Sequence, residues 1–215
     1  MRSMRSRLKY SLSTILIAVS CLHLSACSDA ELPALTGEAR ILAFGDSLTH
    51  GYGVKSSESY PMVLQRLTGL KVINAGVSGE TSEQGLERLP KLLGKLEQES
   101  KTPALVILLE GGNDVLRKVP EAQISHNIAQ MIEITQSKGI PILLVGVPEK
   151  KLFGSTLALY EELAEAYQIP LEDDIVASLV MRPSMKSDYI HFNAQGYQEL
   201  AEAIYQKLKQ AGAVE

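Results

Sequence analysis

Short apolar runs alternate along this chain with segments in which apolar residues recur at helical spacing. Four near-continuous apolar runs, each bounded by Gly, Pro or polar residues, predict strands. They are Arg40–Phe44, Lys71–Ala75, Ala104–Leu109 and Ile140–Val145, and a weaker fifth strand is predicted near Pro170–Leu171. Because the runs are continuous and do not alternate between apolar and polar residues, we expect strands that are buried on both faces.

The segments between these strands have helical spacing. Helices are predicted over Tyr60–Leu67, Thr81–Leu96, Glu121–Ser137 and Ser155–Tyr167, and a last helix over Asn193–Gln210. Strands that alternate with helices in this way form right-handed crossovers, so the sequence predicts an α/β fold with a parallel sheet and helices on both faces. We expect one domain over residues 39–215, preceded by a short polar tether over 27–38, with its site where the strands end.

The first residues have the pattern of an export signal. Residues 1–9 carry four Lys and Arg and no acid, and an apolar stretch follows from about Leu12 to Leu24. The alternative, a membrane anchor, needs about 20 apolar residues, whereas this stretch is shorter and is interrupted by serines and His23. We therefore expect a signal peptide over residues 1–26 and a protein that works outside the cytoplasm.

The end of this signal, Leu24-Ser25-Ala26-Cys27, resembles a bacterial lipobox. In such lipoproteins the cysteine becomes the lipidated first residue of the mature chain, so Cys27 is the expected lipidation site and membrane attachment point. By the same resemblance, Ser28 after the cysteine favours the outer membrane if the host is Gram-negative. The alternative is cleavage at a small-x-small site such as Ser28-Asp29-Ala30, which would leave a soluble periplasmic protein.

Charge and cysteine content exclude several classes of function. Beyond residue 26 the chain has 17 Lys and Arg against 25 Asp and Glu, a net charge of −8 with His neutral. An acidic body without a basic stripe is a poor partner for nucleic acid. Both cysteines, Cys21 and Cys27, lie in or at the leader, so the domain has no disulfide, cysteine ligand or cysteine nucleophile of its own. The oligomeric state is not predicted.

Polar segments follow the first three predicted strands and precede the last helix. Acyl transfer needs a nucleophile, a base, a group that orients the base and donors for the oxyanion. Ser47 is the candidate nucleophile and His191 the candidate base, with Asp188 three residues earlier to accept a hydrogen bond from Nδ1. The N–H groups of Ser47 and Gly79 and the Asn113 amide are the candidate oxyanion hole, and a Cβ at Gly79 is expected to obstruct its N–H.

These segments, in this order, resemble the sequence blocks of the SGNH (GDSL) hydrolase family. They are most similar to its bacterial exported branch of multifunctional acyl thioesterases, lysophospholipases and arylesterases. The resemblance extends from about Arg40 to Leu208. The stretches that carry it are Gly45-Asp46-Ser47-Leu48-Thr49-His50-Gly51-Tyr52, Asn74-Ala75-Gly76-Val77-Ser78-Gly79-Glu80-Thr81, Arg88-Leu89-Pro90, Gly111-Gly112-Asn113-Asp114 and Asp188-x-x-His191.

The resemblance implies both a fold and a set of site residues. The fold is a three-layer α/β/α sandwich with a five-stranded, mainly parallel sheet of flavodoxin-like type. The catalytic residues are Ser47, Asp188 and His191, and the oxyanion hole is formed by Ser47, Gly79 and Asn113. No metal or organic cofactor is implied.

The implied activity is that of a serine esterase. It would hydrolyse carboxylic ester or thioester bonds of small acyl esters or lysophospholipid-like substrates through an acyl-enzyme. One alternative is a carbohydrate O-deacetylase on the same fold, although 5% aromatic residues and no Trp leave little material for stacking on sugars. The other alternative is a non-catalytic lipoprotein interaction module, which would have no physical need for all of the candidate catalytic residues.

Other polar residues are interpreted as structural. His50 is expected either to support the site residues from behind or to lie at the surface. His126 is expected to be solvated or half-buried on a helix, and Asp46 is expected to hydrogen-bond nearby backbone. Glu110 and Asp114 flank a glycine-rich turn and lack a third ligand at useful spacing, so loop scaffolding is preferred over a metal site.

Motifs of competing enzymes are absent from the sequence. There is no G-x-S-x-G elbow, dinucleotide or P-loop glycine motif, or H-E-x-x-H zinc motif. Tyr60-Pro61 stands where the branch often has Trp-Pro, which is expected to change packing and not chemistry. The segments Pro148–Ser155 and Leu179–Ser187 match no motif, and by family resemblance they shape the acyl pocket.

Overall fold

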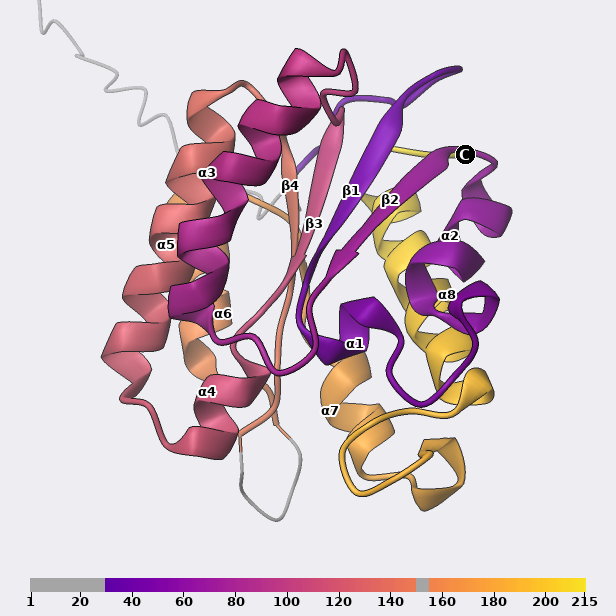
Figure 1. The fold of residues 1–215 in the computed structure, drawn as a ribbon, viewed down its shortest axis with the longest axis vertical. Coiled ribbons are helices and arrows are strands. Elements are labelled where there is room, and N and C mark those ends of the chain that lie inside the picture. The colour runs from indigo at the N-terminus through magenta and orange to yellow at the C-terminus, as the bar shows by residue number, and fades with distance from the viewer. Residues whose placement is uncertain (1–29, 150–154) are drawn as a thin grey trace, which may run out of the picture.

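The computed structural model describes residues 30–149 and 155–215, in which a five-stranded sheet lies between two layers of helices (Figure 1). The strands are β1 (Arg40–Gly45), β2 (Lys71–Gly76), β3 (Leu105–Leu109), β4 (Ile142–Val145) and β5 (Leu171–Glu172). The helices are α1 (Ser47–His50), α2 (Tyr60–Thr68), α3 (Ser82–Gln98), α4 (Gly112–Arg117), α5 (Glu121–Ser137), α6 (Ala158–Tyr167), α7 (Ile175–Val180) and α8 (Ala194–Gln210), with short 3₁₀ helices at Ser56–Glu58 and Pro183–Met185. Every predicted strand forms within two residues of its expected bounds.

The sheet has the strand order β2-β1-β3-β4-β5, and all its neighbouring strands are parallel. Strands β3 and β4 are buried along their whole length, as their continuous apolar runs predict. The strand order reverses between β1 and β3, and in open sheets of this type ligands bind at that reversal, outside the carboxyl ends of the strands. The predicted α/β class and parallel sheet are confirmed.

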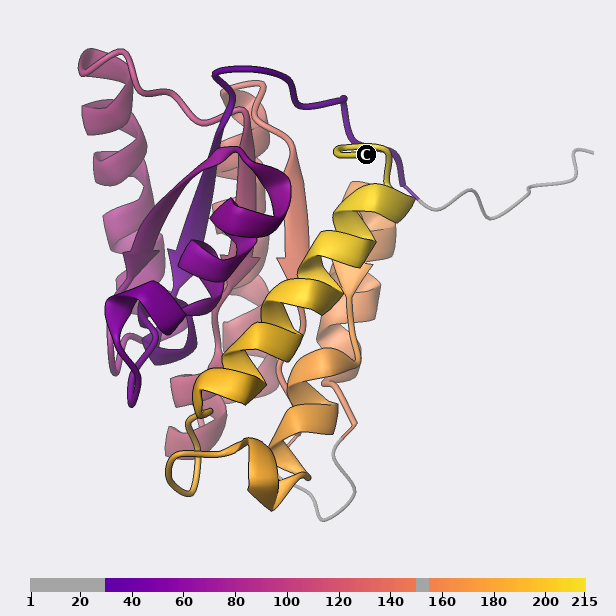
Figure 2. The ribbon, with the colours of Figure 1, turned by 90° about the vertical axis from the view of Figure 1, so that its right-hand side faces the viewer.

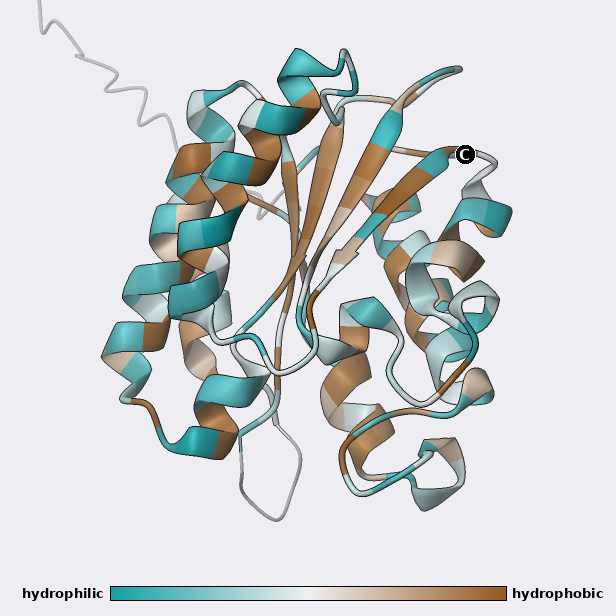
Figure 3. Cartoon of the chain, viewed as in Figure 1, coloured by the Kyte–Doolittle hydropathy of each residue, from teal (hydrophilic) through white to brown (hydrophobic). Residues whose placement is uncertain are grey.

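Helices α3, α5 and α6 cover one face of the sheet, and α2 and α8 cover the other (Figures 1 and 2). Coloured by hydropathy, the strands are mostly hydrophobic and the helices carry their hydrophilic residues on the outside (Figure 3). This arrangement is the predicted three-layer sandwich, in which apolar burial from both helix layers supplies the main stabilising free energy.

Three short helices were not predicted from the sequence. Helices α1 and α4 begin directly after β1 and β3, and α7 lies in the segment before the last helix. They have only four to six residues. Such segments are too short to show a helical period, which needs a window of about 11 residues or more.

The described chain begins at the end of the domain that lies far from the carboxyl ends of the strands. Leu32 and Leu35 donate backbone hydrogen bonds to Ala211 and Ala213, both 2.8 Å, just beyond the end of α8. Helix α8 has 17 residues and is therefore about 25 Å long.

The predicted signal peptide and Cys27 lie outside the described residues. Within the described residues, no helix has the length and apolar character needed to cross a membrane.

Candidate active site

The carboxyl ends of β1, β2 and β3 border a pocket of about 560 Å³. Ser47, Gly79, Asn113 and His191 all line this pocket. Asp188 is hydrogen-bonded to His191 and precedes another lining residue, Tyr189. The structure therefore brings the sequence-predicted site residues together at the reversal of strand order, although they are spread over more than 140 positions of the chain.

Ser47 is the first residue of α1, and this short helix is fixed against the sheet. The Asp46 side chain caps α1 by accepting a hydrogen bond from the Leu48 N–H at 2.9 Å. The helix also lies close to the end of β2, because a Cβ on Gly76 would sit 2.0 Å from the backbone nitrogen of His50. Only glycine permits that approach. Ser47 is thus held in a rigid position at the pocket.

A continuous line of hydrogen-bonding contacts joins Asp188, His191 and Ser47. The Asp188 Oδ2 lies 2.8 Å from His191 Nδ1, and His191 Nε2 lies 3.1 Å from Ser47 Oγ. The other carboxylate oxygen, Oδ1, accepts the backbone N–H groups of His191 and Ile190, each at 2.8 Å. These bonds, with that from the His191 N–H first, lower the pKa of Asp188 to about 2. Asp188 is therefore a carboxylate at neutral pH.

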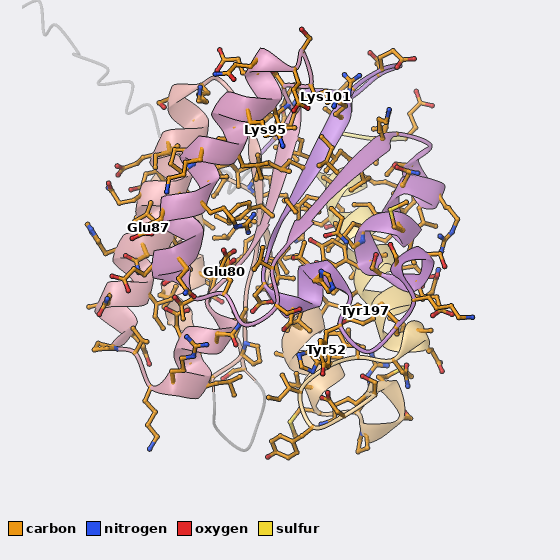
Figure 4. All side chains as sticks on the ribbon, viewed as in Figure 1. Tyr52, Glu80, Glu87, Lys95, Lys101 and Tyr197 are labelled. Atoms are coloured by element: carbon orange, nitrogen blue, oxygen red, sulfur yellow. The ribbon has the colours of Figure 1, made fainter. Side chains whose placement is uncertain are left out.

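One contact of the imidazole was not predicted. The ring of Tyr52 lies 4.3 Å from the ring of His191, centroid to centroid, with 37° between their planes. The backbone carbonyl of Tyr52 accepts a hydrogen bond from the buried Tyr197 hydroxyl at 3.0 Å, and the two tyrosines lie near each other in the lower half of the molecule in Figure 4. Tyr52 is the last residue of the Gly45–Tyr52 stretch that carried the family resemblance. Its place in that stretch was the only signal in the sequence that Tyr52 belongs to the site.

Gly79 lies beside Ser78 on the pocket wall with φ at +81°, in the left-handed region that favours glycine. Among the described residues, no atom other than those of its chain neighbours lies within 4 Å of the position that a Cβ would take. The structure therefore leaves open space for a substrate at this point, and the expectation that a Cβ would obstruct the N–H stays a prediction. Glycine is required here by its backbone conformation.

The Asn113 amide is held by two acceptors. Its Nδ2 donates to the Glu80 carbonyl at 2.8 Å and to Asp46 Oδ2 at 3.2 Å. The longer bond, to Asp46, is the weaker of the two. A negative oxygen in the pocket would therefore compete with, or share, the N–H that now faces Asp46.

Asp46 is more than a helix cap. It is 3% exposed, and burial raises the pKa of its carboxyl to about 6. Its predicted bond to nearby backbone is confirmed by the Leu48 contact, but its bond to Asn113 was not predicted. Asp46 therefore connects the helix that carries Ser47 to the amide of Asn113.

Behind the pocket lie three further buried acids, Glu80, Glu110 and Asp114. Glu80 forms an ion pair with Arg88, whose Nε donates to Oε1 at 2.7 Å and whose guanidinium stacks 4.0 Å from the Phe44 ring centroid. Burial first, and then the charge of Asp46, raise the pKa of Glu110 well above its ordinary value. Both effects disfavour the charged form of this carboxyl.

Helix α4 fixes the loop that contains Gly79. Asp114 accepts hydrogen bonds from the Ser82 N–H at 2.8 Å and from its hydroxyl at 2.7 Å, and Arg117 donates to the Gly79 carbonyl at 3.0 Å. This confirms the loop-scaffolding interpretation for Asp114. In the described ranges, 30–149 and 155–215, no group of three or more His, Cys, Asp or Glu has the arrangement of a metal site.

Much of the remaining wall of the pocket is apolar. It is formed by Leu48, Val115, Leu116, Val147, Pro148, Val176, Val180 and Ile190. Pro148, Glu149, Val180 and Lys186 come from the two segments that matched no motif, so the described parts of those segments do shape the pocket, as expected. Residues 150–154 of the first segment lie outside the described part of the chain. His50 and His126 are exposed and do not line the pocket, in agreement with their interpretation as structural residues.

A parallel α/β sheet with Ser, His and Asp joined in this order at its carboxyl edge defines the class of serine hydrolases. The comparisons with known proteins narrow that class to one family. The model of the GDSL-like lipase/acylhydrolase family matches residues 43–199, and the chain belongs to that family. It is an ester hydrolase of the SGNH type, and the family resemblance found in the sequence is confirmed.

Characterised relatives agree with this assignment. The arylesterase of Vibrio mimicus is 30% identical over 180 residues, covering 79% of this chain and 88% of the relative. The thioesterase 1/protease 1/lysophospholipase L1 of Escherichia coli strain K12 is 30% identical over 177 residues, covering 79% of this chain and 83% of the relative. The crystal structure of AlinE4, an SGNH-hydrolase family esterase, matches with a TM-score of 0.63 at 34% identity, covering 83% of this chain and 98% of that one.

Proposed function

We propose that this protein cleaves carboxylic ester and thioester bonds of acyl substrates through an acyl-enzyme on Ser47. The observation that carries the proposal is the line of contacts from Asp188 Oδ2 through both His191 nitrogens to Ser47 Oγ. In this arrangement His191 Nδ1–H donates to the ionised Asp188, which leaves Nε2 free to accept the Ser47 proton.

In the first half of the reaction, Ser47 Oγ attacks the substrate carbonyl carbon as its proton passes to His191 Nε2. Asp188 stabilises the imidazolium that results. His191 then protonates the departing alcohol or thiol as the carbon–oxygen or carbon–sulfur bond breaks, which leaves the acyl group on Ser47. In the second half, His191 takes a proton from water, the hydroxide oxygen attacks the acyl carbon, and the acid leaves as Ser47 regains its proton.

The negative oxygen that develops in each half is assigned to three donors: the backbone N–H groups of Ser47 and Gly79 and the side-chain amide of Asn113. All three residues line the same pocket. The Asn113 amide is positioned in advance by Glu80 and Asp46. The bond to Glu80 can keep the amide in place while the N–H that faces Asp46 is shared with, or transferred to, the developing oxyanion.

The substrate class follows from the pocket wall. Beyond Ser47, branched aliphatic side chains are the largest group of lining residues, and they suit a hydrocarbon acyl chain better than a sugar. The names of the relatives, arylesterase and thioesterase 1/protease 1/lysophospholipase L1, are consistent with acyl substrates. An acyl ester or lysophospholipid-like molecule is accordingly favoured over an acetylated carbohydrate.

The protein is also proposed to be exported and anchored by a lipid on Cys27, with a soluble periplasmic form as the alternative. The support is the basic and apolar pattern of residues 1–26 and the lipobox-like Leu24–Cys27. Leu32 is fixed to the end of α8 far from the pocket, and four residues separate it from Cys27. Palmitate labelling of the wild type and of Cys27→Ala tests this, and equal labelling would leave the soluble form.

Hydrolysis of a p-nitrophenyl ester series from acetate to palmitate, with one matched acyl thioester, tests the proposed function. We expect turnover that is abolished in Ser47→Ala and a rate that rises beyond the acetate ester because longer chains fill the apolar pocket. An optimum at acetate would favour the O-deacetylase, and no turnover of any ester would favour the non-catalytic module.

A further inference from the structure

The large apolar side chains that are exposed on the described part of the chain are not scattered. They are Tyr52, Val77, Leu116, Met181, Tyr189 and Ile190, with exposed fractions from 37% for Ile190 to 89% for Tyr189. Each of them either lines the pocket or is the chain neighbour of a residue that does. We call these six residues the apolar rim. Clustered apolar exposure of this kind marks an interaction surface, whereas single exposed apolar residues do not.

The apolar rim is continuous with the proposed acyl pocket. Tyr52, Leu116, Tyr189 and Ile190 contribute to both the rim and the pocket lining. In Figure 3, most of α7 and a smaller part of α4 are hydrophobic, and both helices lie in the lower part of the molecule. A hydrocarbon chain that moves from the rim to Ser47 therefore stays in contact with apolar side chains along its path.

The charge around the rim differs from that of the rest of the chain. Three basic residues lie next to the rim: Arg117, Lys118 and Lys186. The acidic residues there are Glu149 and Asp188, and the charge of Asp188 faces His191. The chain beyond residue 26 has a net charge of −8, but this excess of acid is absent from the rim. Lipid headgroups that carry phosphate are consequently not repelled here as they would be elsewhere on the surface.

We propose that the apolar rim docks on a lipid surface, so that an acyl chain passes from that surface into the pocket without crossing water. This inference rests on the proposed function and adds the physical state of the substrate, an amphiphile in a membrane or micelle. Only four residues lie between Cys27 and Leu32, which is fixed at the opposite end of the domain, so the lipid surface that the rim docks on is not the one that would hold the Cys27 anchor. Tyrosine suits such a boundary because its ring is apolar and its hydroxyl remains hydrated. A second copy of the chain seated on the rim would instead close the pocket that the proposed reaction needs open.

Vesicle binding tests the inference in the Ser47→Ala, Cys27→Ala protein, where neither hydrolysis nor an acyl anchor contributes. The probes are vesicles of phosphatidylcholine with and without phosphatidylglycerol, and the measurement is co-sedimentation. The test variant adds Val77→Ser and Met181→Ser, which remove apolar area from the rim at residues that do not line the pocket. We expect binding to both vesicles and a loss of about tenfold in the test variant.

Two controls make the result specific. Tyr205→Ser removes an aromatic ring from α8, where its hydroxyl bonds to the Glu215 carbonyl, and it should bind vesicles like the parent. With Ser47 restored, the Val77→Ser and Met181→Ser protein should hydrolyse monomeric p-nitrophenyl butyrate at the parent rate, which shows that it is folded.

Equal vesicle binding by the parent and the test variant, or no binding by the parent, would overturn the inference. So would a parent protein that is dimeric in solution and becomes monomeric when Val77 and Met181 are changed, because the rim would then be an interface between copies. Absence of butyrate turnover in the Ser47 protein would overturn the proposed function itself, and it is measured separately from vesicle binding.

Discussion

The carboxylate of Asp46 accepts a hydrogen bond from the side-chain amide of Asn113, which lies 67 residues further along the chain, at 3.2 Å. The same carboxylate caps the helix that begins with Ser47. One buried acid therefore sets the relative position of the proposed nucleophile and of a proposed oxyanion donor. A change at Asp46 should therefore affect both catalysis and stability.

Asp46→Asn should lower kcat while leaving KM nearly unchanged. The asparagine oxygen can still cap Leu48, but its amide would face the Asn113 amide, so two donors would oppose each other and Asn113 would turn. Steady-state kinetics with p-nitrophenyl butyrate should show a fall in kcat of about tenfold to 10³-fold. Glu87→Gln, at an exposed acid on α3, is the matched control (Figure 4). A kcat equal to that of the control would remove the positioning role.

The same substitution should also remove a pH dependence from the free energy of unfolding. Burial raises the pKa of Asp46 from 3.8 to about 6, so the folded protein binds this proton more tightly than the unfolded chain. The resulting stability is fully present below about pH 4 and is lost as the pH rises through about 6. Relative to Asp46→Asn, the wild type should lose about 2–3 kcal/mol of unfolding free energy across that window. Urea denaturation at pH 4 and pH 7.5 measures the difference, and a pH-independent difference would contradict the assignment.

Asn113→Ala should cost about 10²- to 10³-fold in kcat if its amide supplies one oxyanion donor. The substitution also removes the bonds to Glu80 and Asp46, so a modest loss of unfolding free energy of about 1 kcal/mol is expected as well. Kinetics and denaturation on the same preparation separate the two effects. A near-normal kcat would show that the oxyanion is stabilised by other groups.

Asp188→Asn should lower kcat by about 10²- to 10⁴-fold, because the new amide would favour the wrong imidazole tautomer. The fold should persist, since the remaining oxygen still accepts the N–H groups of Ile190 and His191. The pKa of Asp188 is held at about 2, so the wild-type pH–rate profile should show no titration of this group above about pH 3. A variant as active as the wild type would mean that His191 is oriented by something else.

The pocket wall should determine the preferred chain length. Val180→Phe adds bulk at a lining position on α7, so kcat/KM for a p-nitrophenyl octanoate should fall about tenfold while the acetate ester is little affected. Ile175→Phe places the same ring on α7 at a residue that does not line the pocket. If both variants show the same chain-length profile as the wild type, the acyl chain lies elsewhere.

Much of the fold was predictable because it depends on local pattern. The buried strands β3 and β4 are continuous apolar runs, and α5 is long enough for its period to define Glu121–Ser137 as the structure has it. Helix α7 was missed because six residues do not reveal a helical period. The strand ends also predicted where Ser47, Gly79 and Asn113 would meet.

Other parts of the site depend on contacts that a sequence does not display. Nothing in the chain links Asp46 to Asn113, or Tyr52 to the His191 ring, because each pair meets only after the sheet forms. The raised pKa of Asp46 depends on burial, which only the folded structure produces. The left-handed backbone at Gly79, with φ at +81°, is a further reason for glycine that the sequence did not display.

Covalent labelling with a fluorophosphonate, followed by mass spectrometry of the peptides, tests the proposed nucleophile most directly. The reagent should add once, on Ser47, and labelling should vanish in Ser47→Ala and slow greatly in His191→Ala. Both variants should retain the thermal midpoint of the wild type within a few degrees, since neither residue fills the core. An adduct on any other residue, or labelling that persists in Ser47→Ala, would contradict the account.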